Sequence, residues 1–459
     1  MTERVPASFR DPAGFVFRRD GVLYRQVNDR NRANYEALMA SGLYDALVDR
    51  TLLVPHAEAE VPAAEPAKGS LVIRPEMVAA ISYPYEWCPG QLRAAGVATL
   101  EIQRIAMEHG MTLRDASVYN IQFHHGRPVL IDTLSFEPMV EGLPWVAYSQ
   151  YCRHFLAPLA LMSHVDVRLG QLLRSEIDGV PLDLASKLLP RRTRLQWGLG
   201  VHLHAHSSSQ QRHAGDGEGS SPGREVSNRA LLGLIDSLMA VTKRLKWQPP
   251  ASTWRDYYAA AESYSDESSA HKRDVVADLL KSIQAEMIWD LGANTGQFSR
   301  LAAEVTGAQV LAIEMDPSAV EIHWQECQRN GDARVLPLLS DLSNPSPSQG
   351  WGHRERDSLE SRGPADAILA LALVHHLAIG NNVPLPDVLQ WLATLGRKVI
   401  IEWIPKDDPM VRRLLATRED IFDEYSTEHF EAAAKEVFDI RSRRELDDSL
   451  RTIYSLERH

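Results

Sequence analysis

The chain has 459 residues, of which 44% are hydrophobic and 24% are charged. This composition is typical of globular proteins and excludes disordered and fibrous classes. The formal net charge of −12 argues against nucleic acid or an anionic membrane surface as a partner.

At this length we expect two or three domains. The three cysteines lie far apart, which favours a reducing compartment and predicts no metal site of the CxxC type. No apolar run approaches the roughly 20 residues that span a bilayer, and the first residues, MTERVPASFRDPAG, carry no apolar signal core. We therefore expect a cytoplasmic protein without a membrane partner.

Composition divides the chain into three regions. We predict an α+β domain over residues 1–200, a flexible linker over 201–228 and a second domain over 229–459. The stretch HSSSQQRHAGDGEGSSPGREVSN, residues 206–228, is rich in Ser and Gly and nearly free of large apolar residues, so it cannot bury enough surface to order itself. A second polar insertion spans residues 343–366.

Along the first region we predict a hairpin over residues 14–27 and helices over 34–48 and 95–110. Asp115 and Asn120 then follow with four residues between them, and Asp132 ends a strand after a second hairpin whose turn reads HHGRP. This pattern resembles the catalytic and metal loops of protein-kinase-like and aminoglycoside-phosphotransferase-like folds. The resemblance implies that Asp115 orients a hydroxyl, while Asn120 and Asp132 hold magnesium against phosphates.

The first region departs from that family in three ways. No glycine-rich phosphate loop precedes the hairpin, Arg25 stands where the third strand would carry Lys, and Thr133 and Leu134 replace the Phe-Gly that would follow Asp132. Arg grips phosphate differently from Lys. We therefore predict a degenerate kinase-like domain that does not transfer phosphate, with an unrelated α+β domain as the alternative.

Three histidines, His202, His204 and His206, alternate just before the linker. In a strand they would share one face and offer a set of zinc ligands. Because the run enters the linker and has no acid nearby, we predict no metal.

After the linker we predict a helix over residues 228–247 and then alternating strands and helices. Strands are predicted at 287–292, 308–316, 333–341, 365–374 and 397–405, with helices at 296–305, 318–330 and 386–395. A helix leading into a strand is predicted at 427–440, and a last strand at 450–458. Continuously apolar strands that alternate with helices predict an α/β fold with a doubly wound, mostly parallel sheet.

The first strand of this series leads into a glycine turn, DLGANTG, from Asp290 to Gly296. A dinucleotide fingerprint needs glycine at its first, third and sixth positions. Counted from Gly292, those later positions are Asn294 and Gln297, so that fingerprint fails. The phosphate loop GxxxxGK[ST] fails as well, since no Lys-Ser or Lys-Thr follows.

The spacing Asp-x-Gly-x-x-x-Gly resembles motif I of class I S-adenosylmethionine (SAM)-dependent methyltransferases, which have a Rossmann-like fold. The resemblance implies SAM as the cofactor, with Gly292, Asn294 and Gly296 letting the backbone approach its methionine part. It also implies that Asp290 lies near the amino group of that part.

Residues after the next two strands extend the resemblance. Glu314 ends the second strand and is placed to accept both ribose hydroxyls, with Asp316 as the less favoured alternative. Met315 is expected to pack on the adenine, and Asp341 to contact the adenine amino group. Upstream, Tyr258, Tyr264 and Lys272 are candidates for a cover over the cofactor; the alternative is an aromatic helix that packs on the sheet.

Three residues are candidates for catalysis. His375 and His376 follow the fourth strand, where some O-methyltransferases of the resembled family place a general base, and an unperturbed pKa near 6.5 suits that role. Because they are adjacent, we expect only one to point inward; the alternative is that they merely begin a helix. Glu402 ends the fifth strand and is the third candidate.

The whole chain resembles nodulation host-specificity methyltransferase-like bacterial proteins. We predict a methyltransferase that acts on a hydroxyl or similar nucleophile of a small molecule or glycan, with the first domain helping to recognise the acceptor. Two alternatives remain: a protein methyltransferase with the first domain as docking module, and a catalytically idle SAM-binding regulator.

Overall fold

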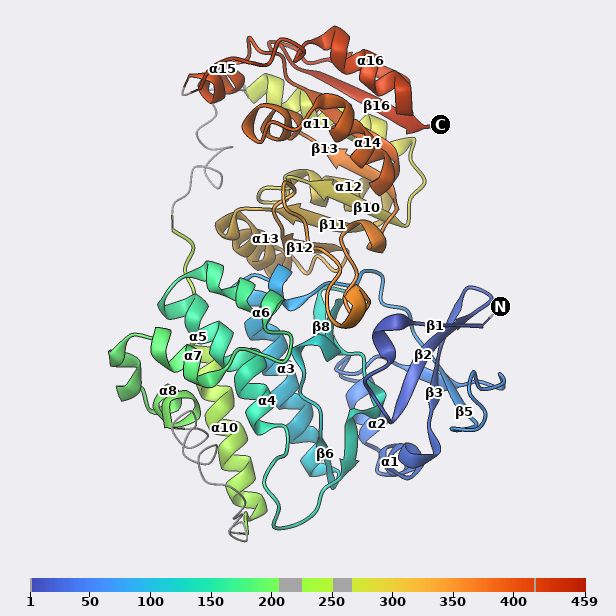
Figure 1. Cartoon of the computed structure of the whole chain (residues 1–459), viewed down its shortest axis with the longest axis vertical. Helices are drawn as coiled ribbons and strands as arrows, with labels where there is room; N and C mark the ends of the chain where they lie inside the picture. Colours follow the sequence, from blue (N-terminus) through green and yellow to red (C-terminus); the bar gives the residue numbers. More distant parts are fainter. Residues whose placement is uncertain (1, 206–224, 251–265, 417) are drawn as a thin grey trace. The chain divides into compact units, whose positions relative to one another are not determined.

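The computed structural model describes residues 2–205, 225–250, 266–416 and 418–459. Its contacts divide the chain into two compact units, which Figure 1 colours along the sequence. Unit 1 comprises Met1–Gln248 together with Gly350–Arg356, and unit 2 comprises Pro249–Gln349 and Asp357–His459. No helix in the described part of the chain is long and apolar enough to span a membrane.

Unit 1 begins with an antiparallel five-stranded sheet in the order β1-β2-β3-β5-β4. Two helices, α1 (Asp29–Ala40) and α2 (Leu43–Val48), separate β3 from β4 in the chain. The strands are β1 (Thr2–Arg4), β2 (Gly14–Arg19), β3 (Val22–Val27), β4 (His56–Glu58) and β5 (Leu71–Pro75). The hairpin predicted over residues 14–27 is present as β2 and β3.

The rest of unit 1 is mainly helical and is built around α3 (Pro89–Glu108), whose apolar positions are buried along its whole length. Two small antiparallel pairs follow it: β6 (Met111–Leu113) with β9 (Phe136–Pro138), and β7 (Ile121–His124) with β8 (Arg127–Leu130). The further helices are α4 (Tyr148–Tyr151), α5 (Ala157–His164), α6 (Leu172–Ser175), α7 (Leu182–Leu188), α8 (Trp197–Leu199) and α10 (Asn228–Arg244).

The boundary between the units differs from the one we predicted at residue 228. The helix predicted over 228–247 is present as α10, but its apolar face packs against α3, so it belongs to unit 1. The predicted linker also begins later than expected, because Gly200–Ala205 forms a π-helix. Residues 206–224 lie outside the described part of the chain.

Part of the predicted polar insertion belongs to unit 1. Glu355 accepts two hydrogen bonds from Arg10, both of 2.7 Å, and the Arg356 guanidinium lies 4.0 Å from the ring centre of Tyr119. Bidentate Arg–carboxylate pairs are among the stronger polar contacts in proteins. Segment 350–356 is therefore a packed part of unit 1, although its neighbours in sequence belong to unit 2.

Unit 2 is built on a seven-stranded sheet in the order β12-β11-β10-β13-β14-β16-β15. The first five strands of that order pair in parallel, whereas β16 lies antiparallel between β14 and β15. The bounds are β10 (Met287–Leu291), β11 (Gln309–Glu314), β12 (Val335–Leu339), β13 (Ala365–Ala370), β14 (Gly396–Trp403), β15 (Phe438–Glu445) and β16 (Thr452–Arg458).

Helices cover both faces of this sheet, with α11 beside α12 and α14 beside α16 (Figure 1). They are α11 (Asp266–Lys281), α12 (Gln297–Thr306), α13 (Pro317–Asn330), α14 (Leu385–Leu395), α15 (Pro409–Leu415) and α16 (Thr427–Val437). The strand interiors are buried and apolar, as expected of parallel strands covered on both faces. The predicted doubly wound α/β fold is confirmed.

The sheet order places a topological switch between β10 and β13. From β10 the chain winds outward to β11 and β12, then returns to β13 on the other side of β10. In open α/β sheets, ligands bind beyond the carboxyl ends of the strands at such a point. The glycine turn after β10 lies at this position.

Candidate cofactor site

The turn between β10 and α12 has three residues in the left-handed backbone region. Their φ values are 78° at Gly292, 49° at Asn294 and 80° at Gly296. The two glycines are required for different reasons. A Cβ on Gly296 would overlap the ring of His323, whereas a Cβ on Gly292 would come no nearer than 3.5 Å to any described residue outside the turn. The backbone at Gly292 therefore remains open to a ligand.

Glu314, the last residue of β11, holds this turn in place. Its carboxylate accepts hydrogen bonds from the backbone amides of Asn294 (2.9 Å), Met315 (2.7 Å) and Asp316 (2.9 Å). A carboxylate offers about four acceptor positions, so these bonds leave capacity for a ligand hydroxyl. Burial raises the pKa of Glu314, although its three amide bonds lower it.

Asp316, the alternative ribose partner, has another role. Its carboxylate accepts a hydrogen bond from the Ser318 amide (2.8 Å) and so caps the N-terminus of α13. Capping by Asp satisfies a helix donor that would otherwise lack a partner. The geometry therefore favours Glu314 as the ribose partner.

Asp290 lies beneath the turn, within the sheet. Its carboxylate is 2% exposed and accepts a hydrogen bond of 2.6 Å from the Ser299 hydroxyl in α12. Burial raises the pKa of Asp290 to about 6, while Ser299 and the cation of Lys272 favour its charged form. The residue is thus mostly ionised at neutral pH and ties the turn to α12.

The segment after β12 lies at the same edge of the sheet as Glu314. The Ser340 amide donates to the Glu314 carbonyl (2.9 Å), which brings the segment after β12 beside Glu314. Asp341 is exposed and accepts hydrogen bonds from the amide and hydroxyl of Ser343. Met315, directly after β11, is 54% exposed.

His375 and His376 follow β13, and their ring centres lie 4.0 Å apart. His375 is completely buried, and neither ring nitrogen has a hydrogen-bond partner among the described residues. His376 is partly exposed. Burial lowers the pKa of His375 far below its usual range and that of His376 to about 4. Both rings are therefore neutral at pH 7, and His376 is the more accessible proton acceptor.

Glu402 and Lys272 form a buried ion pair. The sequence predicted the two residues separately, Glu402 for catalysis and Lys272 for the cofactor, and did not predict that they pair. Lys272 Nζ donates to Glu402 Oε2 at 2.7 Å, and the two side chains are 4% and 0% exposed. Arg451 approaches the other oxygen of Glu402 at 3.7 Å and pairs with Asp408 at 2.7 Å. Two cations and two carboxylates thus balance inside unit 2. This environment favours a structural role for Glu402 over that of a base.

Lys272, predicted as a cofactor residue, nevertheless lies near the turn. Its ammonium group is 5.0 Å from the ring centre of Phe298 in the first turn of α12, and Asp290 acts on its pKa through space. Tyr258 and Tyr264, the other candidates for a cover, lie outside the described residues.

Comparison with known proteins finds a relative that matches nearly the whole chain. Nodulation protein NoeA of Rhizobium meliloti (strain 1021) is 36% identical over 461 residues, which cover 99% of this chain and 96% of the relative. The chain belongs to the NoeA family of nodulation proteins. The resemblance to nodulation proteins is thereby confirmed. No protein-family model matches this NoeA-family chain.

Three solved structures are similar to about half of the NoeA-family chain. WbdD is 14% identical over 44% of this chain and 43% of its own length, with a TM-score of 0.31. A SAM-dependent methyltransferase from Aquifex aeolicus is 13% identical over 47% of this chain and 100% of its own, with a TM-score of 0.33. The mitomycin 7-O-methyltransferase MmcR is 14% identical over 50% and 58%, with a TM-score of 0.29. The doubly wound α/β fold of unit 2 rests on its own strand order and parallel pairing.

In unit 1 of the NoeA-family chain, Ser135 forms hydrogen bonds with Asn120, with Asp132 and with the neighbour of Asp115. The Ser135 carbonyl accepts from the amide of Arg114, the neighbour of Asp115, and its hydroxyl accepts from Asn120 Nδ2 at 3.5 Å. The Ser135 amide donates to the Asp132 carbonyl. Asp115 itself accepts hydrogen bonds from the Ser117 amide (2.9 Å) and Gln150 (2.7 Å).

The charges at these positions are already paired. Arg25 contacts Asp132 at 2.7 Å and Asp11 at 2.8 Å, so one guanidinium joins two carboxylates. Asp132 also accepts a hydrogen bond from the Leu134 amide. A magnesium ion at Asp132 would have to compete with this guanidinium; the absence of phosphate transfer stays a prediction.

His202 and His204 do not form the alternating face that a strand would give. They lie in the π-helix Gly200–Ala205, where hydroxyl groups contact both ring nitrogens of each: Tyr148 and Ser237 at His202, and Ser186 and Thr193 at His204. These bonds give both histidines structural partners. His206 lies outside the described residues.

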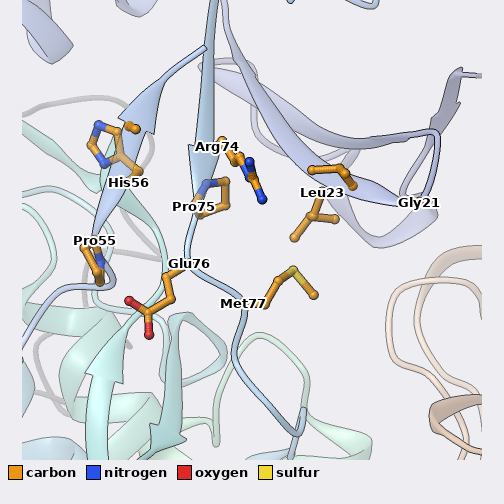
Figure 2. Close-up of a pocket in the computed structure, with 10 residues that line it drawn as sticks. Gly21, Leu23, Pro55, His56, Arg74, Pro75, Glu76 and Met77 are labelled. Atoms are coloured by element: carbon orange, nitrogen blue, oxygen red, sulfur yellow. The ribbon is translucent and has the colours of Figure 1, made fainter.

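Unit 1 also has an open pocket of about 630 Å³ beside the sheet. Figure 2 shows its lining, where the Arg74 and Glu76 side chains at the end of β5 point in different directions. His56 lies on the same wall, and burial lowers its pKa to about 4. Neither the pocket nor His56 was predicted, because no motif marks them.

Proposed function

We propose that this NoeA-family protein transfers a methyl group from SAM to a hydroxyl or similar nucleophile. One observation carries the proposal: the Glu314 carboxylate at the end of β11 is hydrogen-bonded to the backbone of the glycine turn that follows β10. This joins a ribose-binding acid and a close-approach turn at the switch point of the sheet.

The charge of the site supports SAM over a dinucleotide. Asp290, Glu314, Asp316 and Asp341 all lie at the carboxyl ends of β10, β11 and β12. A dinucleotide would bring two phosphate charges toward these carboxylates, whereas SAM brings a sulfonium and an ammonium group with a single carboxylate. Like charges at close range are unfavourable.

For the chemical step, SAM supplies an already activated methyl group when it is bound. The protein then has to orient the acceptor and remove its proton. We propose His376 as the group that accepts this proton, because its ring is the more exposed of the two. Burial lowers its pKa to about 4, so it is a weaker base than the free histidine that the sequence suggested. The ring of His375 lies beside that of His376, with the two ring centres 4.0 Å apart.

We propose a small molecule or a glycan as the acceptor, with unit 1 contributing to its recognition. The kinase-like assignment of unit 1 is part of this proposal, and it is supported by the Asp115, Asn120 and Asp132 segments that meet at Ser135. The acidic net charge of the chain supports the absence of nucleic acid from its partners. The cytoplasmic location inferred from the sequence stays a prediction.

The cofactor assignment can be tested by equilibrium dialysis with isotopically labelled SAM. Gly292→Leu is expected to weaken binding at least tenfold, because its side chain would enter the open space of the turn. Gly307→Leu is the matched control: Gly307 has φ 73° at the far end of α12, with open space around its Cβ. Equal binding by both variants would refute the proposed site.

Two further measurements separate the alternatives. Formation of S-adenosylhomocysteine from bound SAM excludes an idle regulator. Mass spectrometry of lysate incubated with labelled SAM then shows whether the label enters small molecules and glycans, as proposed, or proteins.

A further inference from the structure

We propose that unit 1 binds a divalent transition-metal ion through Glu76, His124 and His125. One nitrogen of each histidine and one carboxylate oxygen lie within 4.8 Å of one another. His124 Nε2 is already 3.0 Å from Glu76 Oε1. This site is separate from the cofactor site of unit 2 and does not depend on the proposed methyl transfer.

The distances suit a tetrahedral ion. Two ligand atoms that each lie about 2.1 Å from zinc are about 3.4 Å apart. His124 Nε2 and Glu76 Oε1, 3.0 Å apart, are slightly closer than this. No two of the three ligand atoms are more than 4.8 Å apart, which is somewhat farther than this. Small side-chain rotations therefore suffice to bring all three atoms onto one ion, which would replace the proton shared by His124 and Glu76.

The backbone holds the two histidines side by side. His124 ends β7 and pairs with Arg127 of β8, so His125 and Gly126 form a two-residue turn with φ values of 49° and 73°. Such a turn fixes the direction of both side chains. The ring centres of His124 and His125 are only 3.9 Å apart, although neighbours in a regular strand point to opposite faces.

The third ligand is also held by its surroundings. The Glu76 amide donates to the Pro55 carbonyl (2.8 Å) at the end of β5. Farther along the same segment, Ser82 exchanges hydrogen bonds with the Gln122 side chain of β7. These contacts fix the segment that carries Glu76 against the hairpin that carries the histidines. A site on such rigid supports loses little entropy when an ion binds.

The ligand set indicates the kind of ion. Imidazole nitrogen suits zinc, nickel and copper, whereas magnesium and calcium prefer oxygen ligands. Three protein ligands leave a fourth position for water or for an oxygen of a bound molecule. Glu76 also lines the pocket of unit 1 together with Arg74 (Figure 2), so an anionic group in that pocket would find positive charge nearby.

Zinc titration of the full, metal-stripped chain by isothermal calorimetry tests the proposal. The wild-type chain is expected to bind one more zinc ion than the variant His124→Thr/His125→Gly, in which glycine suits the left-handed backbone. Glu76→Gln is expected to weaken that site at least tenfold. A matched control, His353→Ala/His459→Ala, removes two exposed histidines elsewhere and should leave the extra site unchanged.

Replacement of zinc by cobalt provides a second readout. The visible absorption of tetrahedral cobalt should appear with the wild-type chain and disappear with the hairpin variant. Equal zinc stoichiometry in the wild type and the hairpin variant would overturn the proposal, as would displacement of zinc by millimolar magnesium. Circular dichroism establishes that the variants are folded.

Discussion

Gly292 and Gly296 share a left-handed backbone, yet the structure assigns them different tasks. A side chain at Gly296 would overlap His323, which is 1% exposed in α13. A Cβ on Gly292, in contrast, would only reach ordinary contact with Leu373, at 3.5 Å. The first glycine therefore serves the approach of the ligand, and the second serves the packing of the turn against α13. The motif alone does not separate these roles, because His323 is 27 residues away in sequence from Gly296.

This difference gives a prediction for alanine variants. Gly296→Ala should lower the free energy of unfolding by more than about 2 kcal/mol, since it adds overlap with His323 to the cost of the left-handed backbone. Gly292→Ala and Gly307→Ala should each lose about 1–2 kcal/mol from the backbone alone. Urea denaturation of the three variants measures the difference.

A double-mutant cycle identifies the cause. His323→Ala removes the ring that a Cβ on Gly296 would meet, so adding Gly296→Ala to it should cost about as much as Gly307→Ala. If Gly296→Ala remains as costly in the His323→Ala background as in the wild type, the ring is not the obstacle and this account of the turn is wrong.

Among the elements, α11 and β14 are joined by a contact that the sequence does not reveal. Lys272 and Glu402 were predicted separately, one as a cofactor residue and the other as a catalytic acid. They meet because α11 packs on α12, above the sheet that carries β14, and 130 residues separate them. Spacing along a helix or strand predicts which face is buried, but not the partner of a buried charge.

The packing partner of α10 could not be predicted from sequence spacing either. Its amphipathic pattern predicted a helix correctly, but a hydrophobic stripe shows only that one face is covered. Its partner, α3, lies more than a hundred residues earlier in the chain. The strands of unit 2 were easier to predict, because their apolar runs are short and alternate with helices, the pattern of buried parallel strands.

The buried pair gives a prediction at this scale. Lys272→Met removes the nearest cation from the buried Glu402 carboxylate, since Arg451 lies 3.7 Å away, and should lower the free energy of unfolding by about 3–5 kcal/mol. Lys272→Met/Glu402→Leu should recover most of this loss, since no charge then remains unpaired. Chemical denaturation measures both variants.

An exposed ion pair of unit 2 provides the control. Lys406 contacts Asp420 at 2.9 Å, with side chains 29% and 45% exposed, and Lys406→Met should change stability by less than about 1 kcal/mol. A double variant that is less stable than Lys272→Met alone would contradict the view that the lost charge balance, and not lost packing, causes the effect.

For the whole molecule, strand–helix alternation was enough to predict the fold of unit 2, and motif I predicted which residues form its candidate site. Asp290, Glu314 and the glycines were identified because their chemistry is local to one turn and one strand end. The pairing of Arg25 with Asp11 and Asp132 could not be identified in this way, since it depends on how distant segments of unit 1 pack. The acceptor is less predictable for the same reason: no single motif encodes it.

Both units share one property that spans the molecule, buried neutral histidines. Burial lowers the pKa of His154 in unit 1 to about 4 and that of His323 in unit 2 to about 3. Two buried acids act in the opposite direction. Burial raises the pKa of Asp11 in unit 1 and of Asp290 in unit 2, so these two residues stabilise the folded protein as pH falls. Burial lowers the pKa values of five other histidines in the same way as those of His154 and His323: His56, His164, His204, His375 and His376.

The sign of the pH dependence follows from these shifts. A histidine whose folded pKa is depressed stays neutral in the folded state, while the unfolded chain takes up a proton below about pH 6.5. Its contribution to stability is therefore complete above pH 6.5 and is lost as pH falls toward 4. We expect both units to lose stability between pH 6.5 and 4.5, by up to about 1.4 kcal/mol per pH unit for each such histidine.

Variants that cannot titrate test whether these two side chains are responsible. His154→Gln and His323→Gln can each lower stability at pH 8, but each should also reduce the slope of unfolding free energy against pH between 6.5 and 4.5, because one fewer proton is taken up on unfolding. Exposed His459, replaced in the same way, should leave the slope unchanged. An unchanged slope in both buried-site variants would show that neither His154 nor His323 causes the loss of stability in acid.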